Sequence, residues 1–188
     1  LSKAEVNLDF KELDQYQKIY SKKFNLKPVS VKSGKINFFD NKKYIADITD
    51  IKFNHKPTQS STNSILKGKF LNDKMYLKVK HKKNDKKDPL SIVFKLLNTK
   101  LLTKIDIFNL PSKTDPISGN IVLKKDKSRL TGNFDYKDAQ LVFKNANLAN
   151  FFLDGTFDGN INFLPYFNFD LDVALKAINF NKFYNFVI

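Results

Sequence analysis

The sequence has no cysteine and no tryptophan, and only six glycines and six prolines among 188 residues. The lack of cysteine excludes a disulfide scaffold and a thiolate metal site, although it leaves the cellular compartment open. Arg129 is the only arginine, so the net charge of +14 comes almost entirely from lysine. Because arginine is the residue that forks onto phosphates and guanine edges, a lysine-only surface is a weak nucleic-acid signature.

Long hydrophobic runs are also missing. No apolar stretch approaches the roughly 18 residues that span a bilayer, and the given sequence starts at Leu1 without an initiating methionine and contains no signal-like segment. These features fit either a cytosolic protein or a segment of a longer chain, and the apolar residues 186–188 at its end favour the segment. We expect residues 1–188 to be a single segment of a longer protein, with residues 1–26 forming an opening strand and helix, and residues 27–188 an antiparallel β-sheet.

Alternation of apolar and polar residues dominates from about Lys32 onward, which is typical of strands with one buried face. Met75, Leu77 and Val79 share one face, and Lys74 and Lys78 take the other. The same period recurs in four further runs, at 90–96, 101–107, 130–136 and 151–175, the last broken by a turn at Pro165. With no βαβ rhythm, the sequence predicts a mainly β fold, a long antiparallel meander.

The connections are polar. Short segments at 72–73, 125–127 and 137–138 predict hairpin turns, and proline-containing segments at 54–64, 81–89 and 109–116 predict longer loops.

Helical spacing appears near the N-terminus, where it predicts one short amphipathic helix over residues 10–23. Its apolar stripe consists of Leu13, Tyr16, Tyr20 and Phe24. We expect this helix to pack over one end of the sheet; the alternative is a helix that lies on a membrane. Phe180, Phe183 and Tyr184 predict a further helical turn at the end of the chain.

Glycine recurs in one pattern, with an apolar residue two positions before it and two positions after it. The five full copies centre on Gly68, Gly119, Gly132, Gly155 and Gly159. In each copy the glycine falls on the apolar face, where it costs stability, so something requires the missing side chain. We favour strong curvature of the sheet as the reason. The alternative is that the missing side chains leave space for a ligand that lies across the strands.

The apolar face must be covered, and one helix cannot cover roughly ten strands. A β-sandwich, a closed barrel, and a sheet curled into a groove or half-barrel are the options. Tight hairpins and long strands disfavour the sandwich with its Greek-key connections. Lysine-rich polar faces disfavour a lipid-embedded barrel. The curled sheet and the sandwich remain open alternatives from the pattern alone.

Four segments carry a family resemblance. VKSGKINFFDNKKYIADITDIKFN (31–54), the glycine-marked hairpins LKGKFLNDKMYLKVK and SGNIVLKKDKSRLTGNFDYKDAQLVF, and FDLDVALKAINFNKFYNF together resemble the repeated β units of AsmA-like proteins. The resemblance covers most of the chain after Leu26. It implies a periplasmic protein, anchored in the inner membrane by a segment not present in this sequence, that serves phospholipid transport and outer-membrane biogenesis through a hydrophobic β-groove.

On this interpretation the protein is not an enzyme, and it binds phospholipid by shielding acyl chains along the apolar face. The predicted lipid-contact residues are Met75, Leu77, Val79, Phe94, Phe157, Ile161, Phe163, Phe169 and Leu171. No cofactor, metal or nucleic acid is expected, and protein partners are unknown. The basic segments 81–87 and 124–129 would attract anionic headgroups if they act at a membrane.

Catalytic signatures are missing from the sequence. His55 and His81 lack a second histidine at ligand spacing, so we expect both to be exposed polar residues. Two aspartate pairs alternate with the apolar face and are expected in solvent: Asp154 with Asp158, and Asp170 with Asp172. The main functional alternative is a β-sandwich that serves as a structural or protein-binding module. A nucleic-acid-binding module is third.

Overall fold

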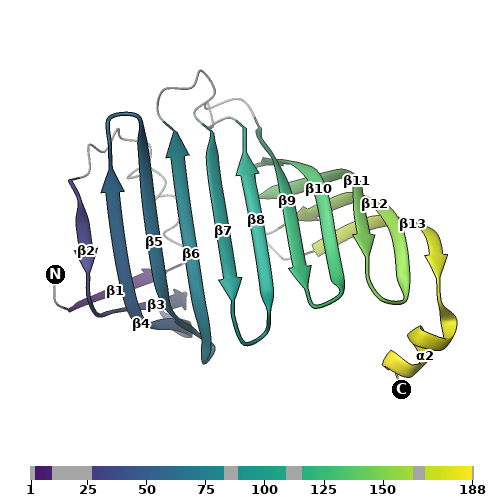
Figure 1. Ribbon diagram of the computed structural model, residues 1–188, viewed down its shortest axis with the longest axis horizontal. Helices are drawn as coiled ribbons and strands as arrows, with labels where there is room; N and C mark the ends of the chain where they lie inside the picture. Colours follow the sequence, from purple (N-terminus) through teal and green to yellow (C-terminus); the bar gives the residue numbers. More distant parts are fainter. Residues whose placement is uncertain (1–2, 10–26, 83–88, 109–115, 163–167, 188) are drawn as a thin grey trace.

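The computed structural model describes residues 3–9, 27–82, 89–108, 116–162 and 168–187 (Figure 1). The helix predicted at 10–23, the predicted turn at Pro165, the side chain of Phe163 and most of the loops predicted at 81–89 and 109–116 lie outside the described residues. The described elements are β1 (Ala4–Asp9), β2 (Val29–Val31), β3 (Gly34–Asp40), β4 (Lys43–Pro57), β5 (Ser61–Phe70), β6 (Asp73–Lys82), β7 (Leu90–Leu96), β8 (Leu101–Ile107), β9 (Ile117–Lys125), β10 (Ser128–Lys137), β11 (Gln140–Ala149), β12 (Leu153–Asn162), β13 (Asn168–Ile178) and α2 (Phe180–Val187).

The strands form one 13-stranded sheet in the order β1, β3, β4 and then each successive strand to β13, with β2 paired to β4 beside this path (Figure 1). The predicted mainly β meander is confirmed. The prediction of a purely antiparallel sheet is wrong at one place, because β1 pairs with β3 in parallel, with Ala4 opposite Gly34 and Leu8 opposite Phe38. The sandwich alternative is wrong as an architecture, since all described strands belong to a single open sheet.

Tight hairpins connect the strands. Both central residues have positive φ at Asn41–Lys42 (50° and 65°), Leu71–Asn72 (48° and 63°) and Asp138–Ala139 (50° and 61°). This is the type I′ geometry, whose twist matches that of paired strands. The turn predicted at 72–73 therefore lies one residue earlier, and the turn predicted at 137–138 lies one residue later.

The loop predicted at 54–64 is wrong. Strand β4 continues to Pro57 and β5 begins at Ser61, with Pro57 opposite Thr62. The Ser61 amide donates to Thr58 Oγ1 at 2.9 Å and closes the connection. Proline is tolerated because it stands at the end of the strand, where a missing amide costs no central ladder bond.

Curvature enters through β-bulges. The register shifts between Thr49 and Lys52, where Asp50 has a φ of 52°, and between Phe143 and Ala146, where Asn145 has a φ of 51°. Bulges of this kind bend the strand and increase its twist. Both ends of the sheet bend away from the viewer in Figure 1, so the face seen there is convex.

The curled sheet leaves much of its surface in solvent. All described strands belong to one sheet whose order runs from β1 to β13 without closing, and Phe169, Val173 and Leu175 on its last strand are exposed. The predicted open, curled form is confirmed, and its hydrophobic residues are only partly covered.

Helix α2 follows the last strand, and the helical turn predicted from Phe180, Phe183 and Tyr184 is confirmed. Asn179 caps its start, because the Lys182 amide donates to Asn179 Oδ1 at 3.0 Å. The ring of Phe183 lies 5.4 Å from that of Phe152, centroid to centroid, and this contact holds the helix against the β11–β12 connection. No helix in the described ranges is long and apolar enough to cross a membrane.

Candidate functional site: the apolar face of the sheet

Cross-strand pairing places the apolar residues of successive strands on one side of the sheet. Residues directly opposite each other in a ladder point to the same face. Leu77 lies opposite Phe94, and Ile105 opposite Ile121. We call this side the apolar face. It carries Phe53, Leu66, Met75, Leu77, Val79, Ile92, Phe94, Ile105, Ile121, Leu130, Phe134, Phe143, Ala146, Phe157, Ile161, Phe169, Leu171, Val173 and Leu175.

All eight described residues among the predicted lipid contacts lie on the apolar face, but in two separate groups. Met75, Leu77, Val79 and Phe94 belong to β6 and β7. Phe157, Ile161, Phe169 and Leu171 belong to β12 and β13, five strands further along the sheet. The apolar face therefore links the two groups but does not bring them together at one point.

A small packed cluster forms where β10, β11 and β12 bend. Phe134, Phe143, Ala146 and Phe157 are buried there, and the rings of Phe143 and Phe157 lie 5.5 Å apart, centroid to centroid. Met75 is buried as well. Met75 and Phe157 thus lie within the floor of the face, and most other apolar residues of the face are half-buried.

The C-terminal end of the apolar face is open. On β13, Phe169 is 64% exposed, Val173 51% and Leu175 52%. These side chains continue the face beyond the packed cluster, with Val173 directly opposite Phe157. A row of exposed apolar side chains on a strand is typical of a surface that binds another apolar group. Without such a partner, contact of these side chains with water is unfavourable.

Atoms of neighbouring residues occupy the space beside the glycines of the repeat. A Cβ at Gly119 would lie 2.8 Å from Cζ of Phe134, and one at Gly132 would lie 2.6 Å from Cβ of Ala146. The space is therefore occupied by the adjacent strand and its side chain. This close approach of neighbouring strands favours curvature of the sheet as the reason for the glycines, and not space for a ligand.

His55 is buried, which corrects the expectation of an exposed residue. Its ring stacks on Phe53 and its Nδ1 lies 2.7 Å from Ser64 Oγ. His81, expected to be exposed as well, is half-buried on β6. Within the described part of the chain, no three histidine, cysteine, aspartate or glutamate side chains gather as metal ligands.

The aspartate pairs lie in solvent on the opposite face, as predicted. Asp154, Asp158, Asp170 and Asp172 are all exposed, and Asp158 is the cross-strand partner of Asp172. Asp158 Oδ1 accepts a hydrogen bond from the Asn145 amide at 2.7 Å. This carboxylate therefore supports the bulge in β11.

Asp73 is a buried carboxylate whose structural role no sequence pattern predicts. Its Oδ1 accepts the Asn98 amide at 2.8 Å, and its Oδ2 accepts the amide and the hydroxyl of Thr99 at 2.9 and 2.8 Å. Burial acts to raise the pKa of Asp73, but the hydrogen bonds from Asn98, Thr99 and Lys74 outweigh it and hold the pKa below its ordinary value of 3.8. The carboxylate therefore fastens the β7–β8 turn to the start of β6.

The lowered pKa predicts a loss of stability in acid. Because the folded pKa lies below the unfolded one, Asp73 contributes its full stabilisation above about pH 4 and loses it as the pH falls through the folded pKa. Asp73→Asn is expected to lower the denaturation midpoint at neutral pH and to flatten its fall in acid, when urea unfolding is followed by circular dichroism across pH. Asp138→Asn, in an exposed turn, is the control. Parallel curves for Asp73→Asn and the unsubstituted protein in acid would contradict this role.

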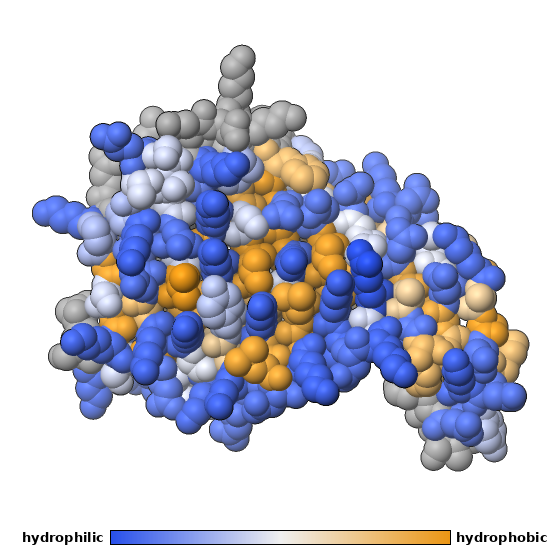
Figure 2. Space-filling model, in the orientation of Figure 1, coloured by the Kyte–Doolittle hydropathy of each residue, from blue (hydrophilic) through white to orange (hydrophobic). Residues whose placement is uncertain are grey.

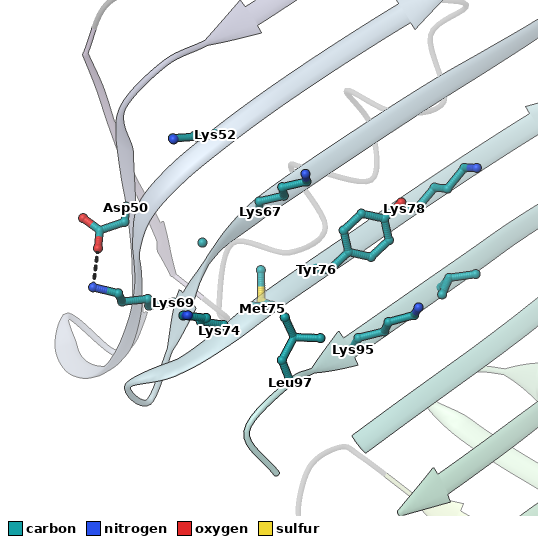
Figure 3. A pocket seen from close by; sticks show the side chains of 12 residues that line it. Asp50, Lys52, Lys67, Lys69, Lys74, Met75, Tyr76, Lys78, Lys95 and Leu97 are labelled. Carbon is teal, nitrogen blue, oxygen red and sulfur yellow. Dashed lines mark ion pairs between the residues drawn. The ribbon is translucent and has the colours of Figure 1, made fainter. Parts of the chain in front are cut away.

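A hollow of about 620 Å³ lies on the opposite, convex side of the sheet (Figure 3). Lys67, Tyr76 and Lys95 follow one another across β5, β6 and β7, and the Lys95 ammonium lies 5.8 Å from the centre of the Tyr76 ring. The alternation of residues places such lysines on the polar face but does not predict that they gather in one place, because their gathering depends on the register between strands.

Comparison with known proteins adds no relative. A scan against protein-family models gave no match, and neither did searches of curated proteins and of solved structures. The resemblance to AsmA-like proteins therefore stays a prediction.

Proposed function

We propose that this protein is a non-enzymatic lipid-handling protein that shields phospholipid acyl chains along its apolar face. The observation that carries the proposal is the continuity of that face, which runs through consecutive strands to the exposed side chains of β13. Acyl chains are apolar and have no hydrogen-bonding groups, so a face of aliphatic and aromatic side chains suits them without further contacts.

Binding would be passive. An acyl chain that lies on β13 covers Val173 and Leu175 and loses its own contact with water, and each buried CH₂ contributes about 0.8 kcal/mol. The headgroup remains in solvent beyond the edge of the sheet. The packed cluster around Phe143 keeps the floor of the groove rigid, so the bound chain does not have to order it.

On the AsmA-like resemblance, we further propose that the protein serves phospholipid transport between bacterial membranes and outer-membrane biogenesis. The same resemblance supports a periplasmic location, with the inner-membrane anchor outside this sequence.

The test is lipid binding by a β13 variant. We expect native mass spectrometry and organic extraction to find phospholipid on the purified chain. A fluorescently labelled phosphatidylethanolamine, presented in detergent, should bind Val173→Asp about tenfold or more weakly than the unsubstituted protein, since a charge against acyl chains costs more than about 1.4 kcal/mol. Val173 suits this test better than Phe157 because its exposed side chain is not needed for packing.

The matched control is Ala174→Asp. It adds the same charge at the next residue of the same strand, on the other face, where Ala174 is exposed. This variant should bind the labelled lipid normally. Equal binding by all three proteins, or a lipid-free protein that takes up no added phospholipid, would refute the proposal.

A further inference from the structure

The convex side of the sheet carries a dense group of lysines around the hollow described above. We call it the lysine array: Lys52, Lys67, Lys69, Lys74, Lys78 and Lys95. Twelve residues line the hollow, and Asp50 is the only acidic one among them. The Asp50 carboxylate lies 2.8 Å from the Lys69 ammonium. The array thus has six positive charges with one negative charge beside them.

Strand register sets two pairs of lysines directly against each other. Lys52 is the cross-strand partner of Lys67, and Lys69 that of Lys74. Like charges in such positions destabilise a sheet. An anion bound over the array would reduce this repulsion between the paired lysines. Binding of an anion is therefore expected to stabilise the sheet.

Two exposed leucines stand at the end of the same strands. Leu71 is 74% exposed in the β5–β6 turn, and Leu97 is 53% exposed in the β7–β8 turn and also lines the hollow. The Leu97 amide donates to the Lys74 carbonyl at 2.9 Å, which joins the β7–β8 turn to the start of β6. Figure 2 shows hydrophilic and hydrophobic residues interleaved over β5–β8 on this side.

Leu71 is unfavourable in two respects. Its φ of 48° belongs to the left-handed region, which asparagine and glycine occupy far more readily than leucine. Its side chain is also 74% exposed, so it gains little burial within the chain. An apolar partner that covered Leu71 would supply the burial that the chain itself does not.

We propose that this side of the sheet docks on an anionic membrane surface, with the lysine array over the headgroups and Leu71 and Leu97 in the interface. Lysines near such a surface attract acidic lipids, and the leucines enter the headgroup–acyl boundary. The leucines favour a bilayer over nucleic acid, which offers no apolar layer for them. This inference goes beyond the acyl-chain groove and does not depend on it, since it concerns the opposite face.

The experiment is flotation of the purified chain with vesicles of phosphatidylcholine alone or of phosphatidylcholine mixed equally with phosphatidylglycerol. Binding is expected only to the anionic vesicles and should weaken at high salt. The double variant Lys67→Glu/Lys95→Glu should bind more than about 30-fold more weakly, since the loss of each lysine charge alone costs about fivefold and each glutamate adds repulsion. Leu71→Asn should weaken binding about tenfold by loss of the inserted side chain, without lowering the denaturation midpoint.

Controls separate this surface from total charge and from the groove. Lys144→Glu changes an exposed lysine away from the array, and Phe108→Asn removes an exposed apolar residue at the other end of β8; both should bind anionic vesicles normally. Val173→Asp should also keep vesicle binding, and the double lysine variant should keep binding of labelled lipid in detergent. Full vesicle binding by Leu71→Asn, or equally tight and salt-dependent binding to a single-stranded oligonucleotide, would overturn the proposal.

Discussion

Replacement of Phe143 by alanine is expected to lower the free energy of unfolding by about 3–5 kcal/mol, the usual cost of removing a buried phenylalanine side chain. Phe143 is buried in the cluster that joins β10, β11 and β12, against Phe134 and Phe157. Few residues of this sheet are buried as deeply. The cavity left by the missing ring therefore lies in the part of the molecule with the best packing, where neighbours relax least.

The matched control is Phe169→Ala. Phe169 lies on the same apolar face but is exposed on β13, so its loss should cost less than about 0.5–1 kcal/mol. Both variants are compared with the unsubstituted protein by urea denaturation, monitored by circular dichroism. Similar costs at the two positions would show that the cluster around Phe143 is not a packed floor.

Gly159→Ala is expected to destabilise the protein by about 1–3 kcal/mol, because its backbone conformation is one that only glycine adopts without strain. Its φ is 149°, and a Cβ there would lie 2.9 Å from Cα of Leu171 and closer still to the carbonyl oxygen of Asp170. Both obstacles are backbone atoms of β13, which cannot turn aside as a side chain does. The substitution should loosen the β12–β13 pair first.

Gly34→Ala is the control for this effect. Gly34 also lies in a strand, but its φ is not in the glycine region, and the nearest atom to an added Cβ is the Ala4 carbonyl oxygen at 3.2 Å. We expect a cost below about 1 kcal/mol. Denaturation midpoints measure both variants, and a Gly159→Ala protein as stable as Gly34→Ala would contradict the close approach of β13.

The sequence predicts the faces of the strands well, because a period of two leaves little freedom once one face is buried. Met75, Leu77 and Val79 lie together on the apolar face, as the alternation indicates. The turn at Leu71–Asn72 lies one residue before its predicted place. Leucine at positive φ is rare in such turns, so no sequence pattern indicates it there.

Other features depend on pairing between strands that no local pattern encodes. The parallel partnership of β1 with β3 joins segments about thirty residues apart, and the lysine array exists only because Lys52 and Lys67 fall opposite each other. The bond network of Asp73 likewise links one hairpin to the next. Such contacts are set by register, and register follows from turns and bulges along the whole chain.

The order of the strands also determines how the protein can be assembled and extended. From β3 to β13 every strand pairs with the strand next to it in the sequence. Each contact is thus made between near neighbours, which keeps the loops that must close during folding short. Stability in such an arrangement is close to a sum over adjacent pairs. A hairpin added at the β13 edge would therefore lengthen the sheet without any change in the pairing of the strands already formed.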